Sequence, residues 1–356
     1  MSQFSFSVIS PSPNDWLEIE SCVDATVFHT RLWDDFLSSL GKKHIVISIA
    51  DKEGSRIGYF LGTKKWIGIR VIGSPSGGAG TFVQGLCLKM EVGIEERIHI
   101  YQELVAYCFL HRLAGYMQIS DWRLMSVYDD LDARLTWSMP LLDQLGVFYT
   151  LRISFFIDTT LPESVLWENL KYKSCKYPIH KAERLGLCVK RIENEEDIAS
   201  FVDTHSELVA DVSRRKKVKR HAHHNKKNLL ALCKALFPDR IIMLQVLGVA
   251  DDGKQHVMSS AIFCIGEAAS NYFSGASNEV YMKYCPNEIM VWEAIKILHQ
   301  RGAGDLILGD VAPYKKKFGS LYGYLPMMVY SKYPFLKDVR GRLKKIYKKF
   351  RDTFHK

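Results

Sequence analysis

Several features that would place this chain in a specialised class of proteins are missing from its sequence. The eight cysteines never form a Cys-x-x-Cys pair, so neither a zinc ribbon nor a disulfide framework is indicated. No apolar run approaches the roughly 18 residues that a membrane-spanning helix needs. Residues 1–10 also lack a basic segment followed by a hydrophobic one. We therefore expect a cytoplasmic protein that holds no metal ion and no tightly bound cofactor.

The composition that remains is that of a folded globular protein. With 356 residues, 47% hydrophobic and 24% charged, the chain is longer than one hydrophobic core usually supports, so two domains are expected. The net charge of +9 is concentrated in two places. Residues 332–356 carry ten Lys/Arg and two Asp, and the run from Arg214 to Lys227 carries eight Lys/Arg and no acid. Both patches predict anionic neighbours.

The order of predicted elements occurs twice along the chain. Ile47 to Gly54 and Leu247 to Gly253 share the same sequence of a strand end, Ala-Asp and a glycine turn. Each is followed by two further strands, a long helix and a short strand, and residues 306–308 are expected to close the second sheet. The pattern predicts an α+β protein with two similar domains, each a mixed, mostly antiparallel sheet flanked by helices. We place them at residues 1–157 and 158–331, with a basic amphipathic helix at 332–356.

The stretch from Asp305 to Gly319 concentrates the most unusual chemistry. An apolar run of strand length ends on Gly309-Asp310, and Tyr314-Lys315 then leads into a Phe318-Gly319 corner. Charged groups are thereby placed at the carboxyl end of a strand, where ligands commonly bind in α/β sheets. We expect the functional site here.

Three blocks of sequence resemble the FemAB-like transferases, which are built from two GNAT-type acyltransferase domains. The first is Tyr314-Lys315 with Phe318-Gly319, which is similar to the family's aromatic-lysine-x-x-Phe-Gly ending. The second runs from Leu166 to Gly186, and the third, Val27 to Trp33, is looser. Two features depart from the family: Lys176 and His180 stand where Arg is more usual, and residues 186–240 hold no counterpart of the long helical arm. Because lysine lacks the bidentate fork of arginine, identical phosphate recognition does not follow.

The resemblance implies direct transfer of an acyl or aminoacyl group to an amine of a cell-envelope sugar or peptide precursor. Attack by an amine builds negative charge on the carbonyl oxygen, and a fixed cation stabilises that charge. Lys315 is the candidate cation, and Asp310 would take the amine's proton or orient the substrate. The plainer alternative is a solvated basic turn at Lys315 and a helix cap at Asp310. The candidate substrate contacts are Tyr314, Tyr272, Lys176, Lys181 and Trp33.

The donor and the partners stay open at this point. Acyl-CoA and aminoacyl-tRNA are both possible donor substrates, although the pyrophosphate-binding loop of acetyl-CoA-dependent GNAT proteins is missing before Asn287. The basic run Arg214 to Lys227 would face phosphates of a donor, a nucleotide sugar or tRNA. The segment 332–356 would lie on an anionic inner membrane surface, which implies a peripheral location, or pack back onto the second domain.

Two other functions fit the same sequence. One is an acyl-CoA-dependent N-acetyltransferase that acts on an amino sugar in surface polysaccharide synthesis. The other is a GNAT-like module without catalytic activity, which would bind anionic lipid or nucleic acid through the two basic patches.

Overall fold

The structure is a computed structural model that describes residues 3–66, 69–73, 85–128, 140–217, 225–309 and 313–333. Asp310 and most of the segment 332–356 lie outside these residues. So do a glycine-rich loop that the sequence predicts at 74–80 and a helix that it predicts around 129–135. No helix in the described ranges is long and apolar enough to cross a membrane. Within the same ranges no group of His, Cys, Asp and Glu side chains has the arrangement of a metal site.

The first half of the chain contributes eight strands and four α-helices to the described structure. The strands are β1 (Phe4–Ile9), β2 (Lys43–Asp51), β3 (Arg56–Trp66), β4 (Arg70–Gly73), β5 (Leu86–Leu88), β6 (Tyr116–Ser120), β7 (Ser126–Tyr128) and β8 (Phe148–Asp158). The helices are α1 (Pro13–Glu20), α2 (Arg31–Ser39), α3 (Ile94–Leu110) and α4 (Pro140–Gln144), with short 3-10 turns η1 (Val27–His29) and η2 (Trp122–Leu124).

The second half repeats this plan. Its strands are β9 (Cys188–Arg191), β10 (Ile241–Val249), β11 (Gln255–Cys264), β12 (Ala269–Ser277), β13 (Asp305–Gly309) and β14 (Leu321–Ser331). Its helices are α5 (Glu163–Asn169), α6 (Tyr177–Arg184), α7 (Asp197–Arg215), α8 (Lys226–Leu236) and α9 (Pro286–Gln300). Shorter turns of helix are η3 (Tyr172–Lys176), η5 (Glu279–Tyr284) and η6 (Pro313–Phe318). The predicted α+β class and the tandem arrangement of similar sheets are confirmed.

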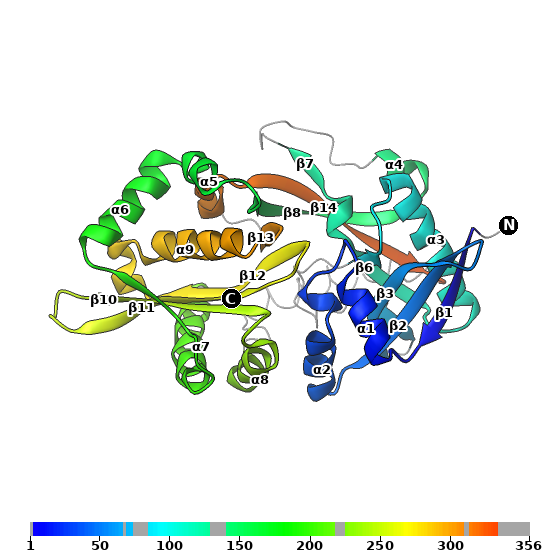
Figure 1. Cartoon of the computed structure of the whole chain (residues 1–356), viewed down its shortest axis with the longest axis horizontal. Coiled ribbons are helices and arrows are strands. Elements are labelled where there is room, and N and C mark those ends of the chain that lie inside the picture. The colour runs from blue at the N-terminus through cyan, green and yellow to red at the C-terminus, as the bar shows by residue number, and fades with distance from the viewer. Residues whose placement is uncertain are drawn as a thin grey trace, which may run out of the picture.

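Both halves build one continuous sheet, in the order β1-β2-β3-β4-β6-β14-β8-β13-β12-β11-β10-β9. In each half the meander is antiparallel and a parallel pair follows it, β4 with β6 and β12 with β13. Helix α9 covers one face of the second half's strands, while α7 and α8 cover the other (Figure 1). In the first half α3 packs on one face of the sheet in the same way.

The two halves exchange strands at their junction. β14, near the end of the described chain, pairs antiparallel with β6 of the first half, and β8 pairs with both β14 and β13. The sequence predicted that residues 306–308 close the second sheet, and this prediction is wrong. β13 lies in the interior of the continuous sheet, between β12 and β8. The division between residues 157 and 158 stays a prediction, and the strands on both sides of it are shared between the halves.

Candidate functional site

The carboxyl end of β13 has an irregular backbone that positions Lys315. Ile307 pairs with Phe156 and Gly309 pairs with Phe155, so Leu308 is an extra residue in the ladder. The Leu308 carbonyl accepts a hydrogen bond from the Lys315 ammonium at 2.6 Å. Lys315 is only 8% exposed, which makes it a buried and fixed cation at the end of a strand. This geometry differs from the solvated basic turn that the sequence left open.

The turn η6 is anchored by the Phe-Gly corner that follows it. The Phe318 ring is 2% exposed and belongs to the main core of the second half. Gly319 has a φ of +71°, and a Cβ on it would lie 2.7 Å from the Asn169 carbonyl oxygen, so only glycine fits this approach. The Lys171 amide also donates to the Lys317 carbonyl at 3.0 Å. The sequence blocks around residues 166–186 and 314–319 therefore meet in space.

A cavity of about 230 Å³ lies on one side of η6. Its lining comes from the end of α7, the strand β12, the turn η5, the start of α9 and η6. The polar and aromatic side chains that line it include Arg215, Tyr272, Asn287, Glu288, Tyr314 and Lys317. Two of the predicted substrate contacts, Tyr272 and Tyr314, are thus brought together at this cavity.

The two tyrosines interact through their hydroxyl groups. The Tyr314 hydroxyl is the hydrogen-bond partner of the Tyr272 hydroxyl, and desolvation followed by this neighbour raises the pKa of Tyr272. The Tyr272 side chain lies back over its own strand, because a Cβ at Gly275 would come within 1.7 Å of its hydroxyl oxygen. Gly275 therefore makes room for the tyrosine. Two neutral hydroxyl groups at a cavity wall can hold a polar substrate group in one orientation.

Glu288 and Lys317 form an ion pair in the cavity wall. Both side chains are largely buried, with 15% and 14% exposure. Across the cavity, the Arg215 guanidinium pairs with Asp211 at 3.1 Å and with Glu279 at 3.2 Å. Glu288 stands in the first turn of α9, where the positive end of the helix dipole favours an anion. The protein's own carboxylate therefore already occupies this position.

Cys285 lies at the edge of the same region. It caps α9 with a φ of +62°, an uncommon backbone conformation for a residue with a side chain. Burial raises the pKa of its thiol, and the nearby Glu288 carboxylate adds to this. A thiol with a raised pKa stays protonated near neutral pH and is a poor nucleophile.

Three predicted substrate contacts lie away from the cavity lining. Lys176 pairs with Glu168 at 3.0 Å and its ammonium lies 5.8 Å from the centre of the Trp167 ring. Lys181 is half-buried and acts electrostatically on Cys285, so it lies near the start of α9. Trp33 is 2% exposed in the core where α2 packs against α8, with its ring 4.7 Å from that of Phe28. The Trp33 indole packs against apolar side chains of both halves of the chain.

The described part of the basic run Arg214 to Lys227 is partly neutralised. Arg214 and Arg215 both pair with Asp211, and Lys226 pairs with Asp203 at 2.7 Å. Residues 218–224 lie outside the described ranges. Contact of this run with phosphates stays a prediction.

Sequence reasoning did not identify Glu288 and Lys317 as partners. Both residues stood in segments that the sequence had singled out, but 29 positions separate them and no local spacing links them. Their charges were the only available signal. The pairing depends on η6 folding back over the start of α9, which local patterns do not reveal.

Comparison with known proteins supports the fold. No protein-family model and no curated protein sequence matches the chain. Among solved structures, the crystal structure of FemX is similar with a TM-score of 0.66, at 13% identity over 90% of this chain and 96% of that one. A tandem GNAT protein from the clavulanic acid biosynthesis pathway, solved without AcCoA, is similar with a TM-score of 0.51, at 7% identity over 93% of this chain and 99% of that one. The chain therefore has the tandem GNAT fold of FemX, as its resemblance to the FemAB-like family implied.

Proposed function

We propose that this chain is an N-acyltransferase that transfers an acyl or aminoacyl group to an amine of a cell-envelope sugar or peptide precursor. The observation that carries this proposal is the Lys315 ammonium, which is buried and held at the carboxyl end of β13 by the Leu308 carbonyl. Burial removes water from around the ammonium, which strengthens its interaction with a negative charge that develops beside it. Stabilising a developing oxyanion is therefore a role that fits this position.

The proposed reaction begins when the nitrogen of the acceptor amine attacks the carbonyl carbon of an activated ester or thioester. The carbonyl oxygen then carries negative charge, which the Lys315 ammonium stabilises because it is already oriented before the reaction. The bond to the leaving oxygen or sulfur breaks, and the amine loses a proton. Asp310 is the proposed acceptor of that proton. The raised pKa of Cys285 favours direct transfer over a thioester intermediate on the enzyme.

The cavity would hold one of the two substrates beside this centre. Tyr272 and Tyr314 supply hydroxyl groups for hydrogen bonds to a sugar or peptide. Glu288 in the first turn of α9 disfavours a pyrophosphate there, since two anions would compete for one helix end. Both acyl-CoA and aminoacyl-tRNA are proposed donors, and Glu288 favours one whose phosphates lie elsewhere.

The test is acyl transfer by the full chain, with a panel of acyl-CoA and aminoacyl-tRNA donors and amine-bearing envelope precursors as acceptors. Product formation is followed by mass spectrometry. Lys315→Met should lower kcat by about 10²–10³, the loss typical of removing an oxyanion donor. Lys316→Met is the matched control, because this neighbouring lysine is only half-buried and its ammonium lies 5.3 Å from the centre of the Tyr322 ring.

Two outcomes would refute the proposal in different ways. Equal rates for Lys315→Met and the unaltered chain would remove Lys315 from the mechanism. The absence of transfer from every donor would instead favour a binding module without catalytic activity.

A further inference from the structure

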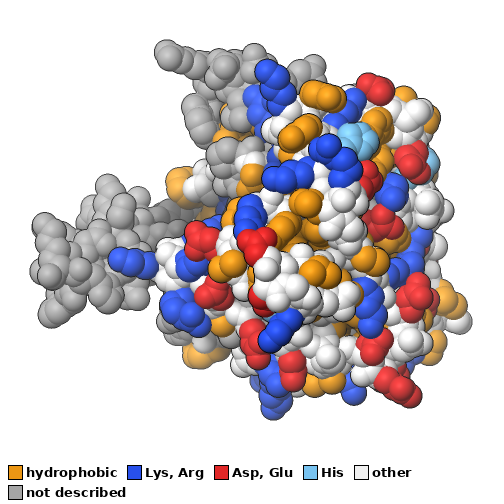
Figure 2. Space-filling model, turned by 90° about the vertical axis from the view of Figure 1, so that its left-hand side faces the viewer, with side chains coloured by type: hydrophobic (Ala, Val, Ile, Leu, Met, Phe, Trp, Pro, Cys, Tyr) orange, Lys and Arg blue, Asp and Glu red, His pale blue; other side chains and the backbone are white. Residues whose placement is uncertain are grey.

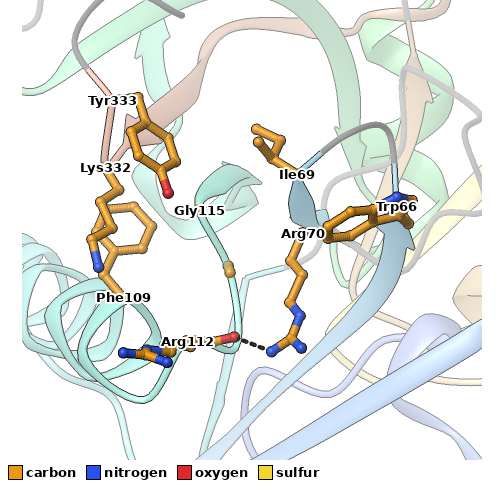
Figure 3. A pocket seen from close by; sticks show the side chains of 9 residues that line it. Trp66, Ile69, Arg70, Phe109, Arg112, Gly115, Lys332 and Tyr333 are labelled. Atoms are coloured by element: carbon orange, nitrogen blue, oxygen red, sulfur yellow. Dashed lines mark hydrogen bonds between the residues drawn. The ribbon is translucent and has the colours of Figure 1, made fainter.

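A second hollowed region lies between strand and helix ends of the first half of the chain and Lys332 and Tyr333, which begin the segment that the sequence predicted to lie on a membrane. Two adjoining hollows of about 260 and 560 Å³ share Trp66 and Arg70 in their walls. Figure 3 shows the smaller one, between the end of α3 and the strand end that leads to Tyr333, with the Arg70 guanidinium donating to the Arg112 carbonyl at 2.6 Å. We call the whole region the Trp66 surface.

The Trp66 surface is rich in positive charge. Among the residues that the structure describes, no Asp or Glu lines either hollow. The exposed basic side chains that line the two hollows are Lys42, Lys43, Lys64, Lys65, Arg70, Arg112 and Lys332. Among the described residues, no carboxylate forms an ion pair with any of these side chains, in contrast to Lys317 and Arg215 at the candidate site. The end of the molecule formed by the second half also differs, since basic and acidic side chains are interspersed over it (Figure 2).

Large apolar side chains stand exposed among these cations. Trp66 is 71% exposed and Tyr333 39%, and the half-buried side chains of Ile69 and Phe109 line the smaller hollow beside them. Other tryptophans of the chain, such as Trp16 and Trp122, are buried. Tryptophan and tyrosine favour the interface between water and lipid, and flanking lysines and arginines favour anionic headgroups.

We propose that the Trp66 surface is a docking surface for a bilayer that contains anionic phospholipid. RNA would also meet a basic surface, but phosphate binding leaves no role for the apolar Ile69 and Phe109 side chains, whereas insertion into a lipid interface removes them and Trp66 from water. The chain also leaves this surface at Tyr333 and continues into residues 334–356, whose sequence alternates basic and apolar residues at helical spacing. The proposal is independent of acyl transfer.

The experiment is co-sedimentation of the full chain with vesicles of equimolar phosphatidylcholine and phosphatidylglycerol, and with phosphatidylcholine vesicles alone. Binding should require the anionic lipid and weaken as salt is added. A near-surface cation contributes about fivefold to affinity, so the double variant Lys64→Gln, Lys65→Gln should bind roughly 25-fold more weakly. The matched control is Lys234→Gln, Lys254→Gln, which removes two exposed lysines of the second half and should bind as the unaltered chain does.

A second measurement reports on Trp66 itself. The tryptophan emission should shift to shorter wavelength on anionic vesicles, and Trp66→Phe should lose this shift while its circular dichroism is unchanged. The proposal is wrong if binding is equal on both kinds of vesicle, if the Lys64, Lys65 double variant binds as well as the control, or if Trp66→Phe keeps the full shift. Binding to RNA without binding to vesicles would also overturn it and assign the surface to nucleic acid.

Discussion

The carboxyl group of Asp305 makes the stability of the seam between the two halves depend on pH. Asp305 opens β13 and is the cross-strand partner of Asp158 on β8. Burial, and then the negative charge of Asp158, raise the pKa of Asp305 from 3.8 to about 6, while Arg123 acts against them. The folded protein therefore holds a proton on this group at pH values where the unfolded chain has lost it.

The direction and size of the effect follow from this shift. Because the folded pKa is the higher one, the contribution of Asp305 to stability is complete below pH 3.8 and is lost as the pH rises through about 6. A difference of about two pKa units corresponds to about 3 kcal/mol. Asp305→Asn keeps the shape of the side chain and cannot ionise, so the variant should gain about 3 kcal/mol relative to the unaltered chain between these two pH values.

The assay is urea-induced unfolding of both proteins at a series of pH values that spans this window. The quantity to plot is the difference in unfolding free energy between variant and unaltered chain. The buried His29, whose pKa is lowered to about 4 by burial, makes the stability fall with decreasing pH. This opposite dependence is common to both proteins and cancels in the difference.

Asp158→Asn serves as the companion variant. It removes the like charge, so the pKa of Asp305 should fall and the pH-dependent loss of stability should shrink. The reasoning is refuted if the difference between Asp305→Asn and the unaltered chain is constant across the window.

Three further substitutions test the packing around the two halves by urea-induced unfolding. Arg97→Met removes the buried cation that pairs with both Asp24 and Asp121 and should cost about 3–5 kcal/mol, even though Arg123 still pairs with Asp24. The exposed Arg56→Met should cost less than about 1 kcal/mol, and equal costs would refute the buried network. Gly319→Ala should destabilise the fold by more than Gly186→Ala. Both glycines have a φ of +71°, but only at residue 319 would a Cβ contact another residue, Asn169. Equal losses of stability would mean that this close approach has no cost. Asn271 is 0% exposed, and its side-chain amide has no hydrogen-bond partner in the described structure. Asn271→Leu should therefore raise the unfolding free energy by about 1–3 kcal/mol. A lower unfolding free energy would show that the amide is hydrogen-bonded in solution.

The amino-acid sequence by itself determined the repeated plan of the fold. Alternating apolar residues and glycine turns specify each meander locally, because neighbouring antiparallel strands are joined by short turns. The Phe318-Gly319 corner is local in part, since its backbone needs a glycine with a φ of +71°, while the approach to Asn169 is a tertiary contact. These local requirements let the sequence motifs point to the tandem GNAT fold, and they singled out Tyr272 and Tyr314 as candidate substrate contacts without showing that the two lie together.

Only the tertiary structure decided which distant segments pair. β14 (Leu321–Ser331) is apolar but was not predicted as a strand. Its partners β6 and β8 lie more than 150 residues earlier in the chain, and no local sequence pattern indicates which segments it pairs with. The Glu288–Lys317 ion pair and the burial of Trp33 between the halves have the same origin. The charge of the Trp66 surface arises in this way too, since its cations come from separate strand ends and a helix end that only the folded sheet brings together.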